Sequence, residues 1–305
     1  MKRLRERARV VADVRRFFDA RGFVEVQTPV MVPSPGLDLH LDAFEVKTAG
    51  DAGPTRWLNT SPEYQMKRLL ADGWERIYQL APCFRRGESG ARHNPEFTML
   101  EWYRAHAGMD DVMEDTEQLV AAVTGGTVRL RERTIDVRPP LERLAVCDAF
   151  SRFAGWPEDQ TLKAAASDED RYFRALVEDV EPALERLDRA VFLVDFPATQ
   201  ASLARKKPTD ARLAERFELY VAGIELCNGF GELTDPLEQR ERLERDRAER
   251  RRRGLAVYPI DERFLDALAR VPPSGGNALG LDRLAAVACG TTEIGEVIAF
   301  GADEV

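Results

Sequence analysis

The sequence predicts a mixed α+β fold, and three observations carry that prediction. Helical periodicity over residues 2–21 is followed at once by a short strand pattern. Two strand patterns flank a loop within residues 76–103, and a further pair joined by a two-residue turn occupies residues 217–226. The 305 residues, 44% of them hydrophobic, are enough to bury a substantial core in one large domain or two smaller ones.

Composition and charge narrow the classes of function. With 44 Lys and Arg against 53 Asp and Glu, the net charge is -9, so a surface built to coat nucleic-acid phosphates is not expected. Five of residues 1–7 are charged, and no stretch approaches about eighteen apolar residues, which argues against a signal peptide and a membrane span. Widely spaced Cys83, Cys147, Cys227 and Cys289 indicate neither a zinc site nor a disulfide framework, so we expect reduced thiols and a cytoplasmic protein.

The first elements are an amphipathic helix and a short strand. Leu4 and Phe18 belong to the apolar stripe of the helix over residues 2–21, and Gly22 follows as its C-terminal cap. Next we expect a strand over 23–26, loops with short strands over 31–60, a helix over 62–70 and strands over 76–80 and 97–103. Residues 104–190 alternate helical patterns with short apolar runs and carry no recognisable set of reactive side chains, so we interpret them as scaffold or insertion.

Residues 217–226 predict a β-hairpin with its turn at 222–223. The simplest register pairs Val221 with Ile224 and Glu218 with Cys227. Glu225 then lies on the same face as Glu218, a diagonal neighbour roughly 7–8 Å away. Two such carboxylates can share a divalent cation or its waters. A pair of this kind, taken alone, is more often solvated, so both interpretations stay open.

A charged helix is predicted from Asp235, its N-cap, and Pro236 to Gly254. Acidic residues four positions before basic ones favour a solvated helix with ion pairs along its surface. The expected pairs are Glu241 with Arg245, Asp246 with Arg250 and Glu249 with Arg253. The alternative is a docking surface for an acidic macromolecule, because residues 250–252 keep a local positive excess.

The loop between the strands at 76–80 and 97–103 combines basic side chains with an aromatic ring. Arg85 and Arg86 precede a glycine-containing turn, Arg92 and His93 follow it, and Phe97 ends it. Guanidinium groups bind phosphate oxygens through paired hydrogen bonds, and a phenyl ring offers a face to a purine. The loop is a candidate nucleotide clamp, although its composition alone is also that of an ordinary surface turn.

These segments resemble the motifs of the class II aminoacyl-tRNA synthetases, and specifically their lysyl branch. Residues 22–29 resemble motif 1, residues 84–101 resemble motif 2, and residues 278–284 resemble motif 3. Segments 61–63 and 225–232 lie between motifs in the family order. The resemblance covers nearly the whole chain, and three motifs in order make it specific.

The resemblance implies a fold and an assembly. The fold would be the class II catalytic core, an antiparallel sheet flanked by helices. The chain would form one catalytic domain over 1–305, with residues 104–190 inserted between motifs 2 and 3. Motif 1 begins almost at residue 1, so no N-terminal anticodon-binding domain is expected. Motif 1 would form the interface of a homodimer.

The resemblance also implies ATP as a substrate, Mg²⁺, and roles for individual residues. Arg85 would bridge the amino-acid carboxylate and the α-phosphate of ATP. Phe97 would stack on adenine, with Arg283 on its other face and near the γ-phosphate, so that Arg85 and Arg283 are the catalytic residues. Glu218 and Glu225 would hold Mg²⁺. The nucleotide site would comprise Arg85, Arg86, Gly87, Glu88, Arg92, His93, Asn94, Phe97, Glu225, Leu226, Gly280 and Arg283.

The amino-acid pocket implied by the resemblance is acidic. Carboxylates from Glu63, Glu101 and Glu232 suit a substrate with two ammonium groups, because each buried charge needs a partner. The substrate would therefore be lysine or a lysine isomer. The pocket would comprise Ser61, Pro62, Glu63, Glu101, Tyr103, Asn228, Phe230, Glu232 and Ala278.

Two departures from the family pattern bear on this site. The family has a Glu two residues after the motif 2 Arg, where this chain has Gly87, with Glu88 one place later. Motif 3 begins with Gly in the tRNA synthetases, where this chain has Ala278. The added methyl would disfavour an α-amino substrate and favour one whose amine is on the next carbon.

A geometric condition also follows. A regular strand over 225–232 would turn Asn228, Phe230 and Glu232 away from the face of Glu225, so the common pocket requires a bulge near Cys227 or Gly229.

Without an anticodon reader, the chain is similar to free-standing lysyl synthetase paralogues that modify elongation factor P, an acidic, tRNA-shaped protein. This resemblance implies adenylation of (R)-β-lysine, or lysine, and transfer to the ε-amine of a lysine on that protein. Two alternatives stay open. A truncated synthetase would charge tRNA or a carrier protein, which the net charge and Ala278 disfavour. An inactive binding module is disfavoured by the joint presence of Arg85, Glu218, Glu225 and Arg283.

Overall fold

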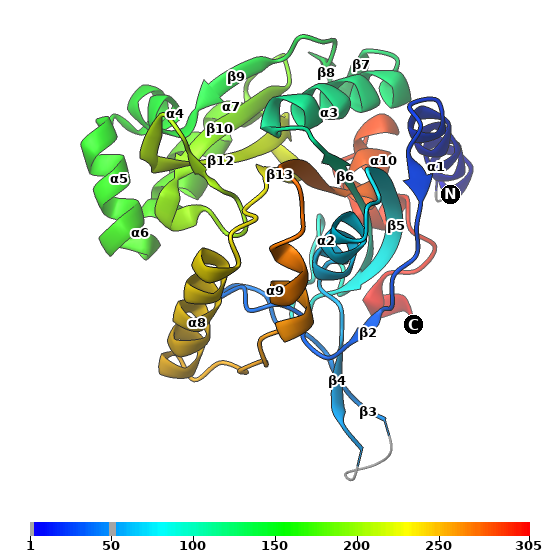
Figure 1. The fold of residues 1–305 in the computed structure, drawn as a ribbon. Coiled ribbons are helices and arrows are strands. Elements are labelled where there is room, and N and C mark those ends of the chain that lie inside the picture. Colours follow the sequence, from blue (N-terminus) through cyan, green and yellow to red (C-terminus); the bar gives the residue numbers. More distant parts are fainter. Residues whose placement is uncertain (1–2, 49–52) are drawn as a thin grey trace.

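The computed structural model describes residues 3–48 and 53–305, in which nine strands form the central sheet (Figure 1). These strands are β1 (Val24–Glu25), β5 (Arg76–Phe84), β6 (Glu96–Ala105), β9 (Glu142–Ala145), β10 (Val191–Pro197), β11 (Lys206–Lys207), β12 (Asp210–Val221), β13 (Ile224–Gly231) and β14 (Ser274–Gly280). They run in the order β1-β5-β6-β14-β13-β12-β10-β9, with β11 paired to β12. Pairs β1–β5 and β9–β10 are parallel and the others antiparallel, which confirms the predicted fold class.

Three helices, α1 (Leu4–Asp19), α3 (Met109–Thr124) and α10 (Leu281–Ala288), pack against the sheet and each other. Their apolar faces and the inner strands bury the largest hydrophobic cluster, which contains Phe18, Trp102 and Phe217. Since α3 belongs to this cluster, the beginning of the 104–190 region is part of the main core.

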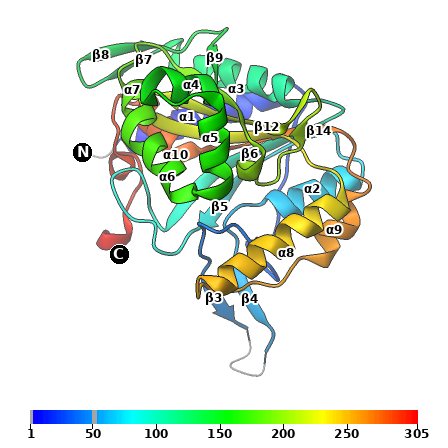
Figure 2. The same cartoon turned by 90° about the vertical axis from the view of Figure 1, so that its left-hand side faces the viewer.

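The remaining helices form two further groups. Helices α4 (Val146–Ala154), α5 (Glu158–Ser167), α6 (Glu169–Ala175) and α7 (Glu181–Glu185) bury a second cluster with a π-helical turn, Leu176–Val180. Helices α2 (Glu63–Ala71), α8 (Pro236–Arg252) and α9 (Glu262–Leu268) bury a third with residues of the loop at 34–43. Figure 2 shows α4–α6 over the sheet and α2, α8 and α9 grouped beside them.

Two small sheets lie outside the main one. One contains β2 (Met31–Val32), β3 (Glu45–Lys47) and β4 (Thr55–Leu58), and β3 and β4 project from the lower end of the molecule in Figure 1. The other contains β7 (Thr127–Leu130) and β8 (Arg133–Asp136). Three short 3₁₀ turns in the described residues are Ala198–Gln200, Ile294–Glu296 and Ala302–Glu304.

The elements predicted before residue 104 are present. The helix predicted over 2–21 is α1, although Lys2 lies outside the described residues, as do residues 49–52 of the predicted loop. The helix predicted over 62–70 is α2. The strands predicted at 76–80 and 97–103 are longer than expected, because β5 and β6 pair without interruption from Arg76 to Phe84.

The β12–β13 hairpin has the predicted turn but not the predicted register. Ala222 and Gly223 have φ of 48° and 72°, the pair of positive values that a type I′ turn requires. Val221 pairs with Ile224 as predicted. The predicted pairing of Glu218 with Cys227 is wrong, because Glu218 pairs with Asn228.

A β-bulge at Leu226 causes this shift. Leu219 pairs with Cys227 and Tyr220 pairs with Glu225, so Leu226 is an extra residue that has no partner on β12. Beyond the bulge, Asn228 and Phe230 lie on the same face of the sheet as Glu225. The sequence analysis required a bulge near Cys227 for this arrangement.

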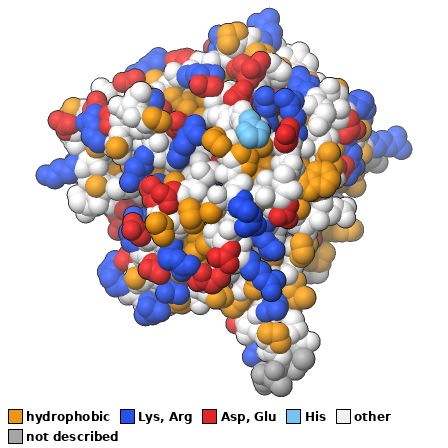
Figure 3. Space-filling view, in the orientation of Figure 1, with side chains coloured by type: hydrophobic (Ala, Val, Ile, Leu, Met, Phe, Trp, Pro, Cys, Tyr) orange, Lys and Arg blue, Asp and Glu red, His pale blue; other side chains and the backbone are white. Residues whose placement is uncertain are grey.

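Helix α8 begins as predicted but differs in its ion pairs. Asp235 caps it by accepting hydrogen bonds from the backbone N–H groups of Leu237 and Glu238. Of the three predicted pairs, the structure contains Glu249 with Arg253, at 2.6 Å. Figure 3 shows basic and acidic side chains interspersed over α8, at the lower left, which favours the solvated interpretation.

The prediction that residues 250–252 present an excess of positive charge is wrong for Arg250, because its side chain is fully buried. Its guanidinium donates to the backbone oxygens of Asp38, Leu41 and Ala256, pairs with the Asp42 carboxylate, and lies 4.8 Å from the centre of the Tyr258 ring. Arg250 thus ties α8 to the loop at 38–42.

We predict that Arg250→Met destabilises the protein by about 3–5 kcal/mol, since removing one partner of a buried charged network leaves the others unpaired. Chemical unfolding measures the difference. Arg251, exposed on the same helix, is the control, and Arg251→Met should change the unfolding free energy by no more than about 0.5 kcal/mol. Equal unfolding midpoints for the two variants would contradict this role of Arg250.

Candidate active site

A cleft of about 780 Å³ lies where the three groups of helices meet the sheet. Its walls come from the loop at 34–41, the β5–β6 loop, strands β12 and β13, the start of α10, and the facing sides of α6 and α8. The 104–190 region therefore contributes to the site, through Glu169, Asp170 and Phe173 of α6.

The structure brings most of the predicted site residues together in this cleft. Those that line it are Ser61, Glu63, Arg85, Glu88, Arg92, His93, Asn94, Phe97, Glu218, Glu225, Leu226, Asn228, Phe230, Ala278, Gly280 and Arg283. Within the described part of the chain, six predicted residues do not line it: Pro62, Arg86, Gly87, Glu101, Tyr103 and Glu232.

One arm of the cleft is basic. Arg85 lies 5.0 Å from the centre of the Phe97 ring, and its Nε donates to the backbone oxygen of Thr60 at 3.4 Å. Arg283 donates to the backbone oxygen of Glu225 at 2.9 Å and lies 2.7 Å from Nε2 of His93. Burial, with the nearby Arg283 charge, lowers the pKa of His93. Cations around an aromatic ring suit a nucleotide polyphosphate.

The β5–β6 loop explains the Gly87–Glu88 departure. Gly87 has φ of 87°, a left-handed turn conformation that favours glycine. This turn directs Glu88 into the cleft, where its Oε1 lies 3.7 Å from Nη1 of Arg85. Arg86 points elsewhere and pairs with Asp42 at 3.4 Å. Glu88, one position later than the family's Glu, therefore contacts Arg85 inside the cleft.

Glu218 and Glu225 share the cleft, because Glu225 pairs with Tyr220, which lies on the same strand face as Glu218. Glu218 is buried and accepts hydrogen bonds from Arg216 at 2.6 Å and the Tyr220 hydroxyl at 2.8 Å. Burial and the Glu225 charge raise its pKa despite Arg216. Arg216 was not predicted, although it lies two residues before Glu218 on the same strand face.

The carboxylate pair has the donor set of a phosphate-assisted magnesium site. In the described part of the chain, no three His, Cys, Asp or Glu side chains are grouped for a metal. Mg²⁺ commonly uses one or two protein carboxylates and completes its shell with phosphate oxygens and water. Glu225 remains half-exposed toward the cleft, so the pair fits Mg²⁺ when a polyphosphate supplies the other ligands.

Next to the cleft lie the buried carboxylates of the predicted amino-acid pocket. Glu101 accepts hydrogen bonds from the Ser61 hydroxyl at 2.7 Å and the Tyr103 hydroxyl at 2.6 Å. Glu232 lies against Gly276, where a Cβ atom would come within 2.3 Å of Oε1 of Glu232. Glycine on β14 therefore makes the space for this carboxylate. Ser61 and Glu63 line the cleft and link it to these carboxylates, Ser61 by its hydrogen bond to Glu101 and Glu63 by its ion pair with Lys67.

The sequence analysis missed the cation inside this pocket. Lys67 is fully buried, and its Nζ lies 2.5 Å from Glu63 and 2.6 Å from Glu232. The flanking carboxylates raise its pKa, so it remains protonated. Its spacing four residues after Glu63 on α2 was the available signal. When Glu63, Glu101 and Glu232 are all ionised, one lysine leaves two uncompensated negative charges, which match two ammonium groups.

Two carboxyl groups of the pocket hold protons more tightly than usual. Burial and the Glu63 charge raise the pKa of Glu101 to about 8. Burial also raises the pKa of Glu232 to about 7, although Lys67 opposes this shift. Near neutral pH both groups are partly protonated in the free protein, and an entering cation favours their ionised forms.

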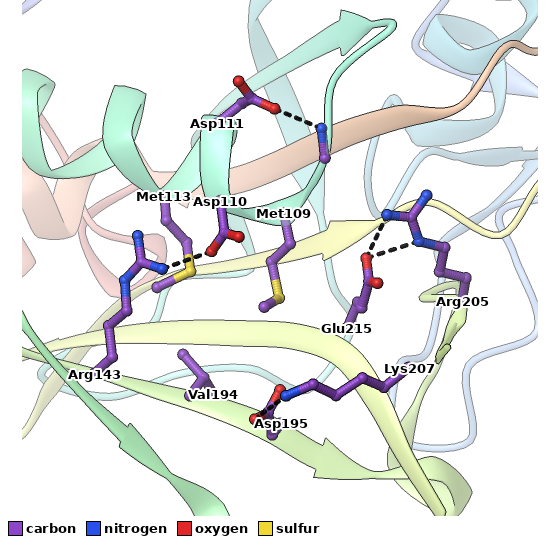
Figure 4. A pocket seen from close by; sticks show the side chains of 11 residues that line it. Met109, Asp110, Asp111, Met113, Arg143, Val194, Asp195, Arg205, Lys207 and Glu215 are labelled. Carbon is purple, nitrogen blue, oxygen red and sulfur yellow. Dashed lines mark hydrogen bonds and ion pairs between the residues drawn. The ribbon is translucent and has the colours of Figure 1, made fainter. Parts of the chain in front are cut away.

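A second cavity, of about 340 Å³, lies at the start of α3. Figure 4 shows each of its basic side chains directed at a carboxylate: Arg143 at Asp110, Arg205 at Glu215 and Lys207 at Asp195. These charges already satisfy one another, whereas the larger cleft carries separate basic and acidic regions. We therefore identify the larger cleft as the candidate active site.

Comparison with known proteins finds a family and relatives that match nearly the whole chain. Residues 1–304 match the family model of the tRNA synthetases class II (D, K and N). The chain is 40% identical to the elongation factor P–(R)-β-lysine ligase of Haemophilus influenzae (strain PittGG), across 99% of this chain and 96% of that protein. It is 43% identical to the proteins of the same name from Erwinia tasmaniensis and Klebsiella pneumoniae (strain 342), each across 98% of this chain and 95% of the relative.

We predict that Lys67→Met destabilises the protein more at about pH 9 than at about pH 6. Without Lys67, the ionised forms of Glu63 and Glu232 lose their buried counter-ion, and the pKa of Glu232, already raised by burial, rises further. The stability of the variant is therefore lost as pH rises through that raised pKa. Unfolding at both pH values measures the effect, with Arg68→Met on the same helix as control. A loss independent of pH would contradict the charge-balancing role.

Proposed function

The chain belongs to the class II tRNA synthetases (D, K and N), and we propose that it is an ATP-dependent, AMP-forming ligase that modifies elongation factor P after its synthesis. It activates (R)-β-lysine, or lysine, as the adenylate and transfers it to the ε-amine of a lysine on that protein. Relatives that match 98–99% of the chain carry this activity in their names.

One observation carries the proposal: the cleft that holds the basic arm is linked, through Ser61 and Glu63, to a buried group of carboxylates. Arg85 and Arg283 offer guanidinium groups to a triphosphate, while the buried Glu101 and Glu232 offer carboxylates to a diamine. The substrate carboxylate would then lie at the junction, beside Arg85.

In the first step, a carboxylate oxygen of the amino acid attacks the α-phosphorus of ATP. The new oxygen–phosphorus bond forms as the bond to pyrophosphate breaks, and pyrophosphate leaves with the electron pair. Arg85 reduces the repulsion between the two anions, and Arg283 binds the departing phosphates. Mg²⁺ bound by Glu218 and Glu225 would neutralise phosphate charge.

In the second step, the unprotonated ε-amine of the acceptor lysine attacks the carbonyl carbon of the adenylate. A carbon–nitrogen bond forms, the bond from that carbon to the phosphate oxygen breaks, and AMP leaves with the electron pair. The nitrogen releases its extra proton to water, and an amide remains.

Ala278 supports the β isomer. It lines the cleft and pairs with Asn228 across β13 and β14, so its methyl group occupies space beside the amino-acid site. A methyl at this position crowds an amine on the α-carbon more than one on the β-carbon.

We also propose a cytoplasmic homodimer. Val24 and Met31, in or next to the segment that resembles motif 1, and Leu4 at the start of α1 are exposed apolar side chains. Strand β1 is an edge strand of the sheet, which a second copy would cover. In the described part of the chain, the four cysteines are free thiols, in keeping with a reducing compartment. None of the described helices is both long and apolar enough to span a membrane.

The test is the intact mass of elongation factor P after incubation with the protein, Mg·ATP and either (R)-β-lysine or L-lysine, with bulk tRNA present. We expect a gain of one lysyl unit, larger with the β isomer. Arg85→Ala should lose pyrophosphate exchange while keeping its fold. Acid-precipitable lysine on tRNA with an unmodified protein acceptor would instead support a tRNA-charging enzyme.

The raised pKa values of Glu101 and Glu232 predict a pH dependence. Their ionised forms bind the ammonium groups, so the KM for lysine in pyrophosphate exchange should fall as pH rises from about 6 to about 8.5. The KM for ATP should change less. Glu232→Gln, which cannot ionise, should raise the KM for lysine and flatten this profile. An unchanged slope in that variant would show that Glu232 does not control the profile.

A further inference from the structure

The cleft has a second arm that the nucleotide and amino-acid assignments leave unused. It lies between the loop at 34–41, α6 and α8, and it is continuous with the basic arm. Because a nucleotide bound at Arg85 and Arg283 would fill the basic arm, a second substrate must reach the reacting carbonyl by another route. The second arm is such a route.

One face of α8 forms a wall of this arm. Gln239, Leu243 and Asp246 lie at spacings of four and three residues, so they share one side of the helix, and all three line the cleft. The face begins with Gln239, one turn into the helix, and runs outward to Asp246. It combines an amide, an apolar side chain and a carboxylate in that order.

Gln239 is the most informative of these residues. Its side chain is fully buried, yet neither Oε1 nor Nε2 has a hydrogen-bond partner within residues 3–48 and 53–305. A buried amide without partners costs free energy, and such groups are rare in folded proteins. Because Gln239 lines the cleft, its amide oxygen and nitrogen can both form hydrogen bonds with a bound ligand.

The outer end of the arm is acidic. Asp38, Glu169, Asp170 and Asp246 line it. Glu169 is already paired with Arg253 at 3.2 Å, and Asp246 has Arg245 at 3.4 Å. Burial and the nearby Asp38 charge raise the pKa of Asp246. The entrance therefore favours a cation over an anion such as a nucleic-acid phosphate.

We propose that Asp38, Gln239, Leu243 and Asp246 form an acceptor arm that receives the lysine side chain of the acceptor protein. The two carboxylates attract its ammonium group at the entrance, Leu243 packs against its methylenes, and the Gln239 amide hydrogen-bonds at the inner end. This inference rests on the proposed ligase function, since it concerns how the second substrate reaches the adenylate.

The experiment separates the two half-reactions. Adenylate formation is measured by pyrophosphate exchange with (R)-β-lysine, and transfer by single-turnover acylation of elongation factor P by adenylate-loaded protein. For Asp246→Asn and Gln239→Leu, we expect the ratio of the transfer rate to the exchange rate to fall at least tenfold. Asp38→Asn should lower the same ratio, and because Asp38 is exposed, this variant tests the charge without disturbing a buried site.

Glu244→Gln is the matched control, because Glu244 lies on α8 but is exposed. It removes the same charge from the same helix and should leave the ratio within twofold. If all three arm variants behave like this control, the acceptor arm is overturned while the ligase function stands. If exchange and transfer fall together, the α8 face belongs to the amino-acid site, and the proposal is equally overturned. If the unaltered protein activates lysine but acylates tRNA alone, both proposals fail.

Discussion

The geometry of the site depends on one extra residue in β13. Without Leu226 in excess, Glu225 would face away from Asn228 and Phe230, and the carboxylate pair would be separated from the amino-acid pocket by the sheet itself. With it, Glu218, Glu225, Asn228 and Phe230 line one cleft. The bulge thus joins the region suited to phosphate with the region suited to a diamine.

Charge balance is the second constraint. Three carboxylates close together, two of them buried, are unstable as anions, and the protein meets this cost in two ways: Lys67 neutralises one charge, and raised pKa values leave Glu101 and Glu232 partly protonated. When a diamine enters and both groups ionise, two negative charges match its two ammonium groups. Selectivity for a diamine is therefore a property of the whole cluster and not of a single residue.

The sequence was informative wherever local pattern decides the structure. The fold class, the hairpin turn at 222–223 and the cap at Asp235 followed from periodicity and turn chemistry. The family resemblance supplied most of the predicted site residues, and sixteen of these line the cleft. The register of β13 could not be predicted in detail, because a bulge depends on how neighbouring strands pair. The burial of Arg250 was equally hidden, since an arginine in a run of charged residues looks solvated until the loop at 38–42 packs over it.

Arg250 and Lys67 have the same physical role at different sites of the cleft. Each is a buried cation that holds a wall of the cleft: Lys67 fixes Glu63 and Glu232, and Arg250 fixes the loop that carries Asp38. Asp42, held by Arg250, also pairs with Arg86 of the β5–β6 loop, so α8 and the basic arm share an anchor. Lys67 and Arg250 pair with buried or partly buried groups of the protein itself. They therefore neutralise only part of the negative charge around the cleft. Both amine-bearing substrates of the proposed reaction, the diamine and the acceptor lysine, can then be attracted electrostatically.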